Sequence, residues 1–359
     1  MKLVLEDGTE LAGTSCAAQE SVAGEVVFNT AMTGYVETLT DPSYRGQILV
    51  LTYPLVGNYG VPAPRDPNSL ARPFESDRIQ VQALVVQNYV DHHSHHESTR
   101  SLAEWCASEN VPLITGIDTR NLTQKLRENG TMRGWVVTGN VAEGKKAARE
   151  IDMRDEVFRS VAPAETKVYE GGSPKILLVD AGCKDNICRS MLERGATVVR
   201  APYFADIVKL ANECDGVLLG NGPGNPQNLG ELIDKVKVLI ETYDKPMFGV
   251  CLGNQILAHA AGGTTAKMRY GHRSVNQPVQ DLLTRHSYIT SQNHGYAVQD
   301  ESLPDGWEPW FVNLNDGTNE GIRCRRKPFF SVQFHPEASP GPQDTAFLFD
   351  EFLRRVGRS

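Results

Sequence analysis

The chain has 359 residues, which is enough for two domains that each bury a core without disulfide or metal cross-links. Its 36 Lys and Arg against 44 Asp and Glu give a net charge of −8, and no basic block is present, which argues against a nucleic-acid partner. The start of the chain does not resemble a signal peptide and no apolar run approaches membrane-spanning length, so we expect a cytoplasmic protein with no membrane partner. The seven cysteines are scattered and include no C-x-x-C pair, which indicates reduced thiols rather than disulfides or a zinc site.

The first half of the chain is predicted to be a mixed α/β domain rich in strands. Asp7-Gly8 is a hairpin signal between strands at 2–6 and 9–13. Further strand-like runs are 25–28, 48–53 and 81–90.

Two helices are expected after these strands. Ser101 and Glu104 form a capping box for a helix that continues to Ala107. A second helix is predicted over 119–129 and is followed by a glycine. The histidines in the segment His92–His96 are interpreted as part of a solvated loop, because no Cys, Asp or Glu with ligand spacing accompanies them.

A linker is predicted at 151–173, where periodicity is lost and a Gly/Ser/Pro cluster follows. It separates a first domain at 1–150 from a second at 174–359. The second domain alternates short apolar strands with helical segments, which predicts a mostly parallel sheet flanked by helices. The expected parallel strands are 176–179, 196–199, 216–219 and 247–250. The expected helices include 231–243 and a last helix at 345–355 that is capped by Asp344.

The clearest chemical signal is Gly249-x-Cys251-x-Gly253, between the strand at 247–250 and a helix predicted over 254–261. This is the form of a nucleophile elbow, in which flanking glycines allow close packing around a strained turn. A helix N-terminus favours the thiolate, so Cys251 is a candidate nucleophile. The alternative interpretation is a small buried apolar residue.

A cysteine nucleophile needs a base and a group that orients the base. His335 and Glu337 follow an apolar strand and, in extended structure, face the same way. Taken alone, this spacing is also common in surface turns. The glycines of the segment Leu219–Pro226, together with the N–H of Leu252, are candidates for stabilising a tetrahedral oxyanion.

These segments together carry a resemblance to a known family. The second half resembles the class I glutamine amidotransferases in four segments: Leu219–Pro226, Gly249–Gln255, Asn293–Tyr296 and Gln333–Glu337. The first half is similar to the N-terminal domain of the small-subunit family of carbamoyl-phosphate synthases, in the segments Phe28–Tyr35, Leu39–Tyr44, Leu51–Pro54, Gly57–Gly60 and Gly116–Arg120.

The resemblance implies that Cys251 attacks the side-chain amide of L-glutamine, with His335 as acid and base and Glu337 holding the imidazole. It further implies a set of glutamine contacts: Ser43, Gly222, Gly224, Leu252, Gln255, Asn293, Gly295 and Tyr296. The implied partner is the large synthetase subunit, which receives the ammonia and binds ATP and Mg²⁺. No metal or cofactor is expected in this chain.

Two departures from the family pattern are present. Gly271–Pro278 lacks two histidines of the usual Gly-His-His-Gly-x-Asn-His-Pro stretch, and Asn225 stands where Asp is usual. The alternatives to a small subunit are another class I amidotransferase, a noncatalytic regulatory subunit, and a cysteine hydrolase acting on peptides or γ-glutamyl chains.

Overall fold

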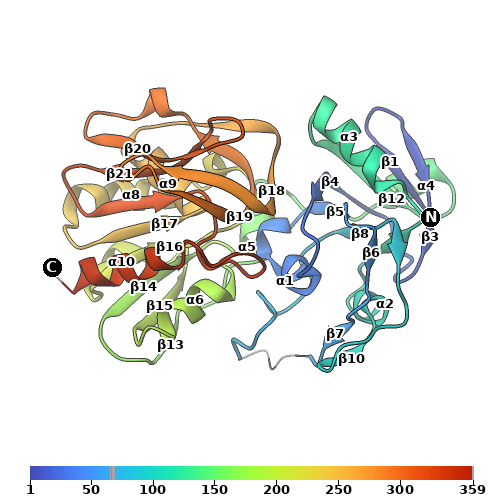
Figure 1. The fold of residues 1–359 in the computed structure, drawn as a ribbon, viewed down its shortest axis with the longest axis horizontal. Coiled ribbons are helices and arrows are strands. Elements are labelled where there is room, and N and C mark those ends of the chain that lie inside the picture. Colours follow the sequence, from blue (N-terminus) through green and yellow to red (C-terminus); the bar gives the residue numbers. More distant parts are fainter. Residues whose placement is uncertain (65, 67–68, 358–359) are drawn as a thin grey trace. The chain divides into compact units, whose positions relative to one another are not determined.

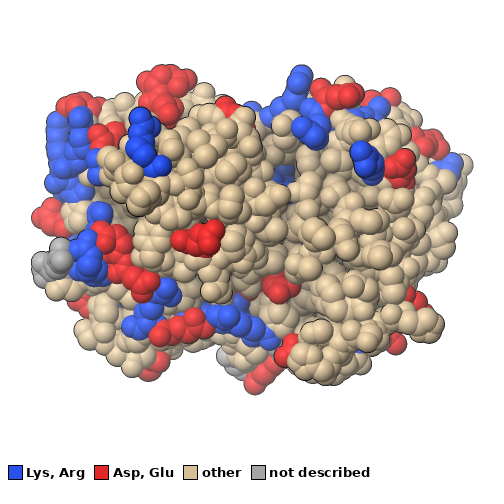
Figure 2. Space-filling view, viewed as in Figure 1, with Lys and Arg blue, Asp and Glu red and all other residues tan. Residues whose placement is uncertain are grey.

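The protein is described by a computed structural model over residues 1–64, 66 and 69–357, and it divides into two units, Met1–Met153 and Arg154–Ser359. Figure 1 shows the elements of both units. In the described part of the chain, no helix combines the length and the apolarity needed to cross a membrane. On the face drawn in Figure 2, basic and acidic side chains are interspersed rather than gathered by sign.

The described residues of the N-terminal unit form mainly short strands, together with four α-helices. Its strands are β1 (Lys2–Leu5), β2 (Glu10–Ala12), β3 (Thr14–Ser15), β4 (Val22–Asn29), β5 (Gln47–Leu51), β6 (Leu55–Val56), β7 (Val61–Pro62), β8 (Ala83–Val85), β9 (Asn88–Tyr89), β10 (Ser98–Arg100), β11 (Leu113–Thr115) and β12 (Met132–Val137). Its helices are α1 (Tyr35–Thr40), the 3-10 turn η1 (Pro42–Tyr44), α2 (Leu102–Ser108), α3 (Thr119–Asn129) and α4 (Val141–Ala147).

Eight of these strands form one mixed sheet in the order β2-β1-β12-β4-β5-β8-β11-β3. The predicted hairpin is confirmed, because β1 and β2 pair antiparallel around Asp7-Gly8. The capping box is also confirmed: Ser101 Oγ accepts from the N–H of Glu104 at 3.1 Å, and Glu104 Oε2 accepts from the N–H of Ser101 at 2.7 Å. The run at 81–90 is divided into β8 and β9, which belong to different sheets.

The described residues of the C-terminal unit form ten further strands, six α-helices and two 3-10 turns. Its strands are β13 (Lys167–Tyr169), β14 (Lys175–Asp180), β15 (Thr197–Pro202), β16 (Gly216–Leu219), β17 (Met247–Val250), β18 (Thr265–Asp281), β19 (Ser287–Val298), β20 (Trp307–Asn313), β21 (Asn319–Cys324) and β22 (Phe329–Val332). Its helices are α5 (Glu156–Arg159), α6 (Asp185–Leu192), α7 (Ile207–Asn212), η2 (Pro226–Asn228), α8 (Gly230–Thr242), α9 (Leu252–Ala261), η3 (Asp300–Ser302) and α10 (Phe347–Val356).

These strands form one sheet in the order β13-β15-β14-β16-β17-β22-β21-β20-β18-β19. The five strands from β15 to β22 run parallel, which confirms the four predicted parallel strands and adds β22 to them. The strands from β21 to β19 extend the sheet antiparallel, a part that the alternation of strands and helices did not specify. Because parallel strands end at one edge, the loops after β14, β16, β17 and β22 meet there.

An aromatic cluster fixes this part of the sheet against α10. The ring of Phe248 on β17 stacks on Phe330 of β22 at 4.8 Å and contacts Phe349 and Phe352 of α10 at 5.8 Å. All four rings are fully buried. The strand that precedes the candidate nucleophile is therefore held in a close-packed core.

Two details differ from the sequence predictions. The segment 151–173, expected as a linker, contains α5 and β13, and β13 pairs antiparallel with β15. The last helix begins at Phe347 with Ala346 as its N-cap, so Asp344 does not cap it. Short segments such as α5 and β13 are stabilised by tertiary pairing, which local periodicity does not report.

Candidate active site

The candidate nucleophile Cys251 lies on the sharp turn between β17 and α9. Its backbone has φ 55° and ψ −104°, a conformation that is strained for a residue with a side chain. The turn is held by a hydrogen bond from the N–H of Cys251 to the carbonyl of Val332, at 2.8 Å. Such strain, fixed by surrounding structure, is a feature of nucleophile elbows.

Both glycines of the elbow are required by packing. A Cβ on Gly249 would lie 2.7 Å from the carbonyl of Gly253, and a Cβ on Gly253 would overlap the carbonyl oxygen of Leu219. The spacing of glycine, cysteine and glycine in the sequence therefore reflects close backbone contacts between β16, β17 and α9. The helix starts at Leu252, two residues earlier than predicted.

His335 and Glu337 come together as the sequence predicted. Nδ1 of His335 is 2.6 Å from Oε1 of Glu337, and both side chains are buried. Within the described residues, Nε2 of His335 has no hydrogen-bond partner. The N–H of His335 donates to the carbonyl of Ser291 on β19, at 2.9 Å, which fixes the loop after β22. Glu337 therefore orients the imidazole through Nδ1 and leaves Nε2 to exchange a proton with a reacting group.

The buried charges stabilise a protonated imidazole beside a carboxylate. Burial alone lowers the pKa of His335, but the charge of Glu337 and then that of Cys251 outweigh it and raise the pKa. Burial also opposes ionisation of Glu337, yet Lys184 and His335 lower the pKa of this carboxyl to about 2. Cys251 acts on the pKa of His335 through its charge and a hydrogen bond, which identifies the thiol as a neighbour of the imidazole.

Lys184 is a site residue that the sequence analysis did not identify. Its Nζ lies 3.2 Å from Oε1 of Glu337 in a buried ion pair and also donates to the carbonyl of Ala338. Nearby, Nδ2 of Asn186 donates to the carbonyl of Glu337 at 2.5 Å. Both residues follow β14, so polar residues at the carboxyl end of a buried parallel strand were the available signal.

The loop after β16 lies beside the elbow. A Cβ on Gly222 would be 2.6 Å from the carbonyl oxygen of Ala181 and 2.7 Å from Cδ2 of Leu252. Gly224 has φ +78°, which favours glycine. Leu252 is the first residue of α9, so its N–H has no acceptor within the helix. The arrangement brings backbone N–H groups near Cys251, as an oxyanion site needs.

The strand β19 runs along the other side of the nucleophile. Sγ of Cys251 is 3.7 Å from the carbonyl oxygen of Asn293. Nε2 of Gln255 donates to the carbonyl of Tyr296 at 3.0 Å and to Oε1 of Gln333 at 3.1 Å. Gly295 is half-buried between the two β19 residues. The structure thus brings four predicted glutamine contacts and the nucleophile into one region.

Ser43, the remaining predicted contact, belongs to the N-terminal unit. It lies in η1, is buried, and its N–H donates to Oδ1 of Asp41 at 2.9 Å. Its role toward glutamine stays a prediction.

The departures from the family pattern have local explanations. Oδ1 of Asn225 accepts from the N–H of Gln227 at 3.1 Å and caps η2, a task for which Asn and Asp are equivalent. Arg273 donates to the carbonyl of Tyr270 at 2.6 Å, and Gln277 donates to Ser274 Oγ at 3.0 Å.

His92, His95 and His96 are exposed on the connection between β9 and β10.

Comparison with known proteins assigns both halves of the chain. Residues 177–355 match the family described as glutamine amidotransferase class-I, and residues 3–136 match carbamoyl-phosphate synthase small chain, CPSase domain. A carbamoyl phosphate synthase arginine-specific small chain from Saccharomyces cerevisiae is 46% identical, over 98% of this chain and 87% of that protein. The protein of that name from Phaeosphaeria nodorum is 44% identical, over 99% of this chain and 75% of that protein.

A larger relative shares the same similarity. The multifunctional protein pyr1-3 of Dictyostelium discoideum is 46% identical over 99% of this chain, which spans only 17% of that protein. Similarity over almost the whole chain, together with the matched families in both halves, leaves one assignment. The chain belongs to the carbamoyl-phosphate synthase small-chain family, and its C-terminal unit is a class I glutamine amidotransferase.

Proposed function

We propose that this chain is the glutamine-hydrolysing subunit of a carbamoyl-phosphate synthase and that Cys251 is its nucleophile. One observation carries the proposal: the strained elbow presents Cys251 beside a buried imidazole whose Nδ1 is held by Glu337 at 2.6 Å and on whose pKa the thiol acts. This arrangement has the nucleophile, base and orienting group that covalent catalysis requires.

The first step is attack of the Cys251 thiolate on the side-chain carbonyl carbon of glutamine. The tetrahedral oxyanion is stabilised by the N–H of Leu252 and a glycine N–H of the loop after β16, a contact typically worth about 2.7–4 kcal/mol. The C–N bond then breaks, and His335 Nε2 gives its proton to the departing nitrogen. The products of this step are ammonia and a glutamyl thioester on Cys251.

The second step is hydrolysis of the thioester. His335, now neutral, takes a proton from water, whose oxygen attacks the thioester carbonyl. The carbon–sulfur bond breaks, glutamate leaves and the thiolate and imidazolium are restored. The ionised Glu337 stabilises each imidazolium state and maintains the tautomer that presents Nε2 to the reaction.

The ammonia is then transferred to a large synthetase subunit, which uses ATP and bicarbonate to form carbamoyl phosphate for arginine or pyrimidine synthesis. This step is supported by the names of the relatives, which include arginine-specific small chains and multifunctional proteins. In this proposal ATP and Mg²⁺ bind to the partner, and this chain contributes no cofactor to the reaction.

The test measures glutamate release by the purified chain and by its Cys251→Ala variant, with and without the large subunit. We expect activity that depends on Cys251 and that increases with the partner. In the reconstituted complex, Cys251→Ser should abolish carbamoyl phosphate synthesis from glutamine while sparing synthesis from added ammonia. Equal loss of both activities would refute the division of labour proposed here.

The same assay separates the alternatives. Complex formation without glutamate release would indicate a noncatalytic regulatory subunit. Cleavage of γ-glutamyl peptides at a rate comparable with glutamine hydrolysis would indicate a peptide hydrolase instead.

A further inference from the structure

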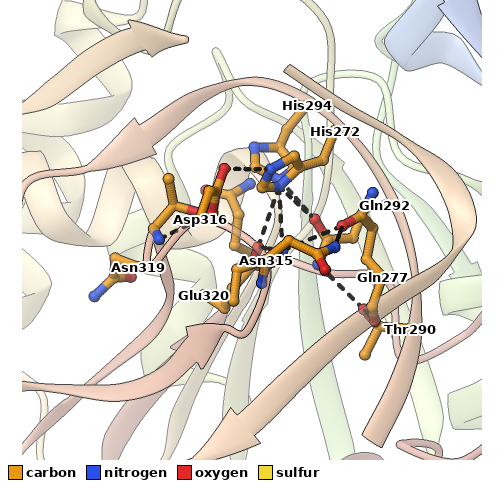
Figure 3. Close-up of polar contacts among 12 residues, drawn as sticks. His272, Gln277, Thr290, Gln292, His294, Asn315, Asp316, Asn319 and Glu320 are labelled. Atoms are coloured by element: carbon orange, nitrogen blue, oxygen red, sulfur yellow. Dashed lines mark hydrogen bonds and ion pairs between the residues drawn. The ribbon is translucent and has the colours of Figure 1, made fainter. Parts of the chain in front are cut away.

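A second group of buried polar side chains lies in the antiparallel part of the C-terminal sheet (Figure 3). His272 on β18, Gln292 and His294 on β19, and Glu320 on β21 form this group, which we name the inner cluster. The four residues are between 0% and 5% exposed. The proposed mechanism uses none of these side chains.

The outer nitrogen of each imidazole has a fixed acceptor. Nδ1 of His294 is 2.8 Å from the carbonyl oxygen of Tyr296, and Nε2 of His272 is 2.9 Å from Oδ2 of Asp316. A backbone carbonyl can only accept, so His294 carries its proton on Nδ1. Hydrogen bonds of this kind, to a carbonyl or a carboxylate, orient the histidines of metal sites. When both imidazoles are neutral, these hydrogen bonds leave the lone pairs of the two inner nitrogens, Nδ1 of His272 and Nε2 of His294, facing the cluster.

The orientation of the Gln292 amide follows from its neighbour Thr290. The hydroxyl of Thr290 donates to the carbonyl of Gln277 at 2.9 Å, which uses its only proton. Thr290 Oγ1 therefore accepts from Nε2 of Gln292, at 3.1 Å. The amide oxygen of Gln292 must then point at the histidines, where Figure 3 shows it.

Several acceptor atoms consequently converge on one point. Oε1 of Gln292 is 2.9 Å from Nδ1 of His272 and 3.0 Å from Nε2 of His294. Oε1 of Glu320 is 3.3 Å from Nδ1 of His272, and the ligand atoms of the two histidines and Glu320 all lie within 4.8 Å of one another. Ligands bound about 2.0–2.2 Å from a tetrahedral zinc ion lie about 3.3–3.6 Å apart. The 3.3 Å between His272 and Glu320 fits this value, and the other ligand atoms, within 4.8 Å, would draw in around the ion.

The carboxylate of Glu320 adds a second indication. Its Oε1 accepts from Nδ2 of Asn313 at 2.9 Å, but its Oε2 is buried and has no partner in the described part of the chain. A buried carboxylate oxygen without a donor costs free energy, and a cation is one group that removes this cost.

We propose that the inner cluster is a binding site for one divalent transition-metal ion of the zinc type, held by His272, His294 and Glu320 with the amide oxygen of Gln292 beside them. Nitrogen and carboxylate ligands of this kind suit such ions. With both imidazoles neutral, the two positive charges balance the carboxylates of Glu320 and Asp316. This site goes beyond glutamine hydrolysis and does not depend on it.

The competing occupant of the same point is a proton on His272 Nδ1. Burial lowers the pKa of His272, but Glu320 and Asp316 outweigh it and raise this pKa. A proton would satisfy His272 but leaves the inner nitrogen of His294 facing the oxygen of Gln292 with no proton between them. The ion would take the lone pairs of both inner nitrogens and neutralise the buried carboxylate of Glu320.

The position of the site predicts its effect. The ligands come from β18, β19 and β21, so an ion would fix three strands of the antiparallel extension to one another. His294 is adjacent to Asn293, whose carbonyl contacts the nucleophile. We therefore expect the ion to stabilise the C-terminal unit and the strand that lines the catalytic cysteine.

The test uses the full chain in a background with His92→Asn, His95→Asn and His96→Asn, because these exposed histidines are potential surface ligands. The chain is dialysed against a chelator and titrated with Co²⁺, whose d–d absorption reports the coordination geometry, and Zn²⁺ is then added as a competitor. We expect one Co²⁺ per chain, with no sulfur-to-metal charge-transfer band, and its displacement by one Zn²⁺. Zinc should also raise the thermal unfolding midpoint.

Variants then identify the ligands. Glu320→Gln and His272→Asn should each weaken Zn²⁺ binding at least tenfold and remove the thermal shift, whereas His286→Asn, which changes an exposed histidine, should alter neither. If the chain with the three surface histidines replaced binds neither Co²⁺ nor Zn²⁺ stoichiometrically, the proposal is overturned. The inner cluster would then hold a proton on His272 Nδ1 instead of a metal ion. Binding that survives both ligand variants would overturn it as well.

Discussion

The ion pair between Lys184 and Glu337 allows the stability of the site to be separated from its catalysis. The substitution to make is Glu337→Gln, which keeps the shape of the side chain and an oxygen for His335 but removes the charge. Lys184 then remains buried without its carboxylate partner, because its side chain is only 4% exposed. Removing one member of a buried pair typically costs about 3–5 kcal/mol.

The expected size of the effect follows from this burial. For a unit of about 200 residues, a loss of 1 kcal/mol lowers the unfolding midpoint by about 2–4 °C, so Glu337→Gln should lower it by about 6–20 °C. Glutamate release should fall by roughly 10³–10⁴-fold, because the imidazolium loses the charge that orients and stabilises it.

The double variant Lys184→Met with Glu337→Gln provides the decisive measurement. Replacing both members of a buried pair is often neutral or stabilising, so the double variant should recover most of the lost unfolding midpoint. Its glutaminase activity should remain as low as that of Glu337→Gln alone. Differential scanning calorimetry and a coupled glutamate assay measure the two quantities on the same samples.

An exposed ion pair supplies the control. Lys2 and Glu10 pair at 2.9 Å with side chains 44% and 45% exposed, so Glu10→Gln should change stability by less than about 1 kcal/mol. If Glu337→Gln costs no more than Glu10→Gln, or if the double variant is less stable than the single one, the buried-charge argument is wrong.

Three further predictions concern the elbow around Cys251, the loss of stability at low pH and the N-terminal unit. Gly253→Ala should lower glutaminase activity at least a hundredfold, because the added Cβ would overlap the Leu219 carbonyl. Gly230→Ala is the control and should leave the activity unchanged, because a Cβ there meets no atom within 4 Å. Equal activities of the two variants would contradict the packing argument. The pKa of Glu337 is lowered to about 2, so the stability that its charge contributes is present above about pH 4.5 and is lost as pH falls toward 2. The unfolding midpoint measured against pH should show this loss. The same pH profile in Glu337→Gln would contradict the prediction. Ser101→Ala should cost the N-terminal unit about 1 kcal/mol in denaturant unfolding without changing activity, and a cost near zero would show that the capping box is dispensable.

The sequence predicted the elements whose stabilising contacts are local. Asp7-Gly8, the capping box at Ser101 and the elbow around Cys251 each occupy a few consecutive residues, so their chemistry can be read from the order of residues. The cap of the last helix failed for the opposite reason. Asp344 has the right residue type, but the helix begins at Phe347, directly before the buried Leu348 and Phe349.

The electrostatic environment of the site could not be read in this way. Lys184 is separated from Glu337 by more than 150 residues, and the two meet only because β14 and β22 end at the same edge of a parallel sheet. The sequence offered several polar residues after β14 and no local reason to choose among them. The order of strands in the sheet decides which lysine is buried beside His335 and Glu337.

The inner cluster extends this argument to metal ligands. Ligand spacing in a sequence is informative when the ligands share one turn or one helix, as in Cys-x-x-Cys, and no such spacing exists here. His272, His294 and Glu320 instead occupy three strands. β18 pairs directly with β19, and β20 separates it from β21. The segment His92–His96 is the densest group of histidines in the sequence, but His92, His95 and His96 are exposed and therefore lack the burial of the inner cluster. Convergence of buried lone pairs, rather than density along the chain, is therefore the criterion that distinguishes a candidate metal site in this fold.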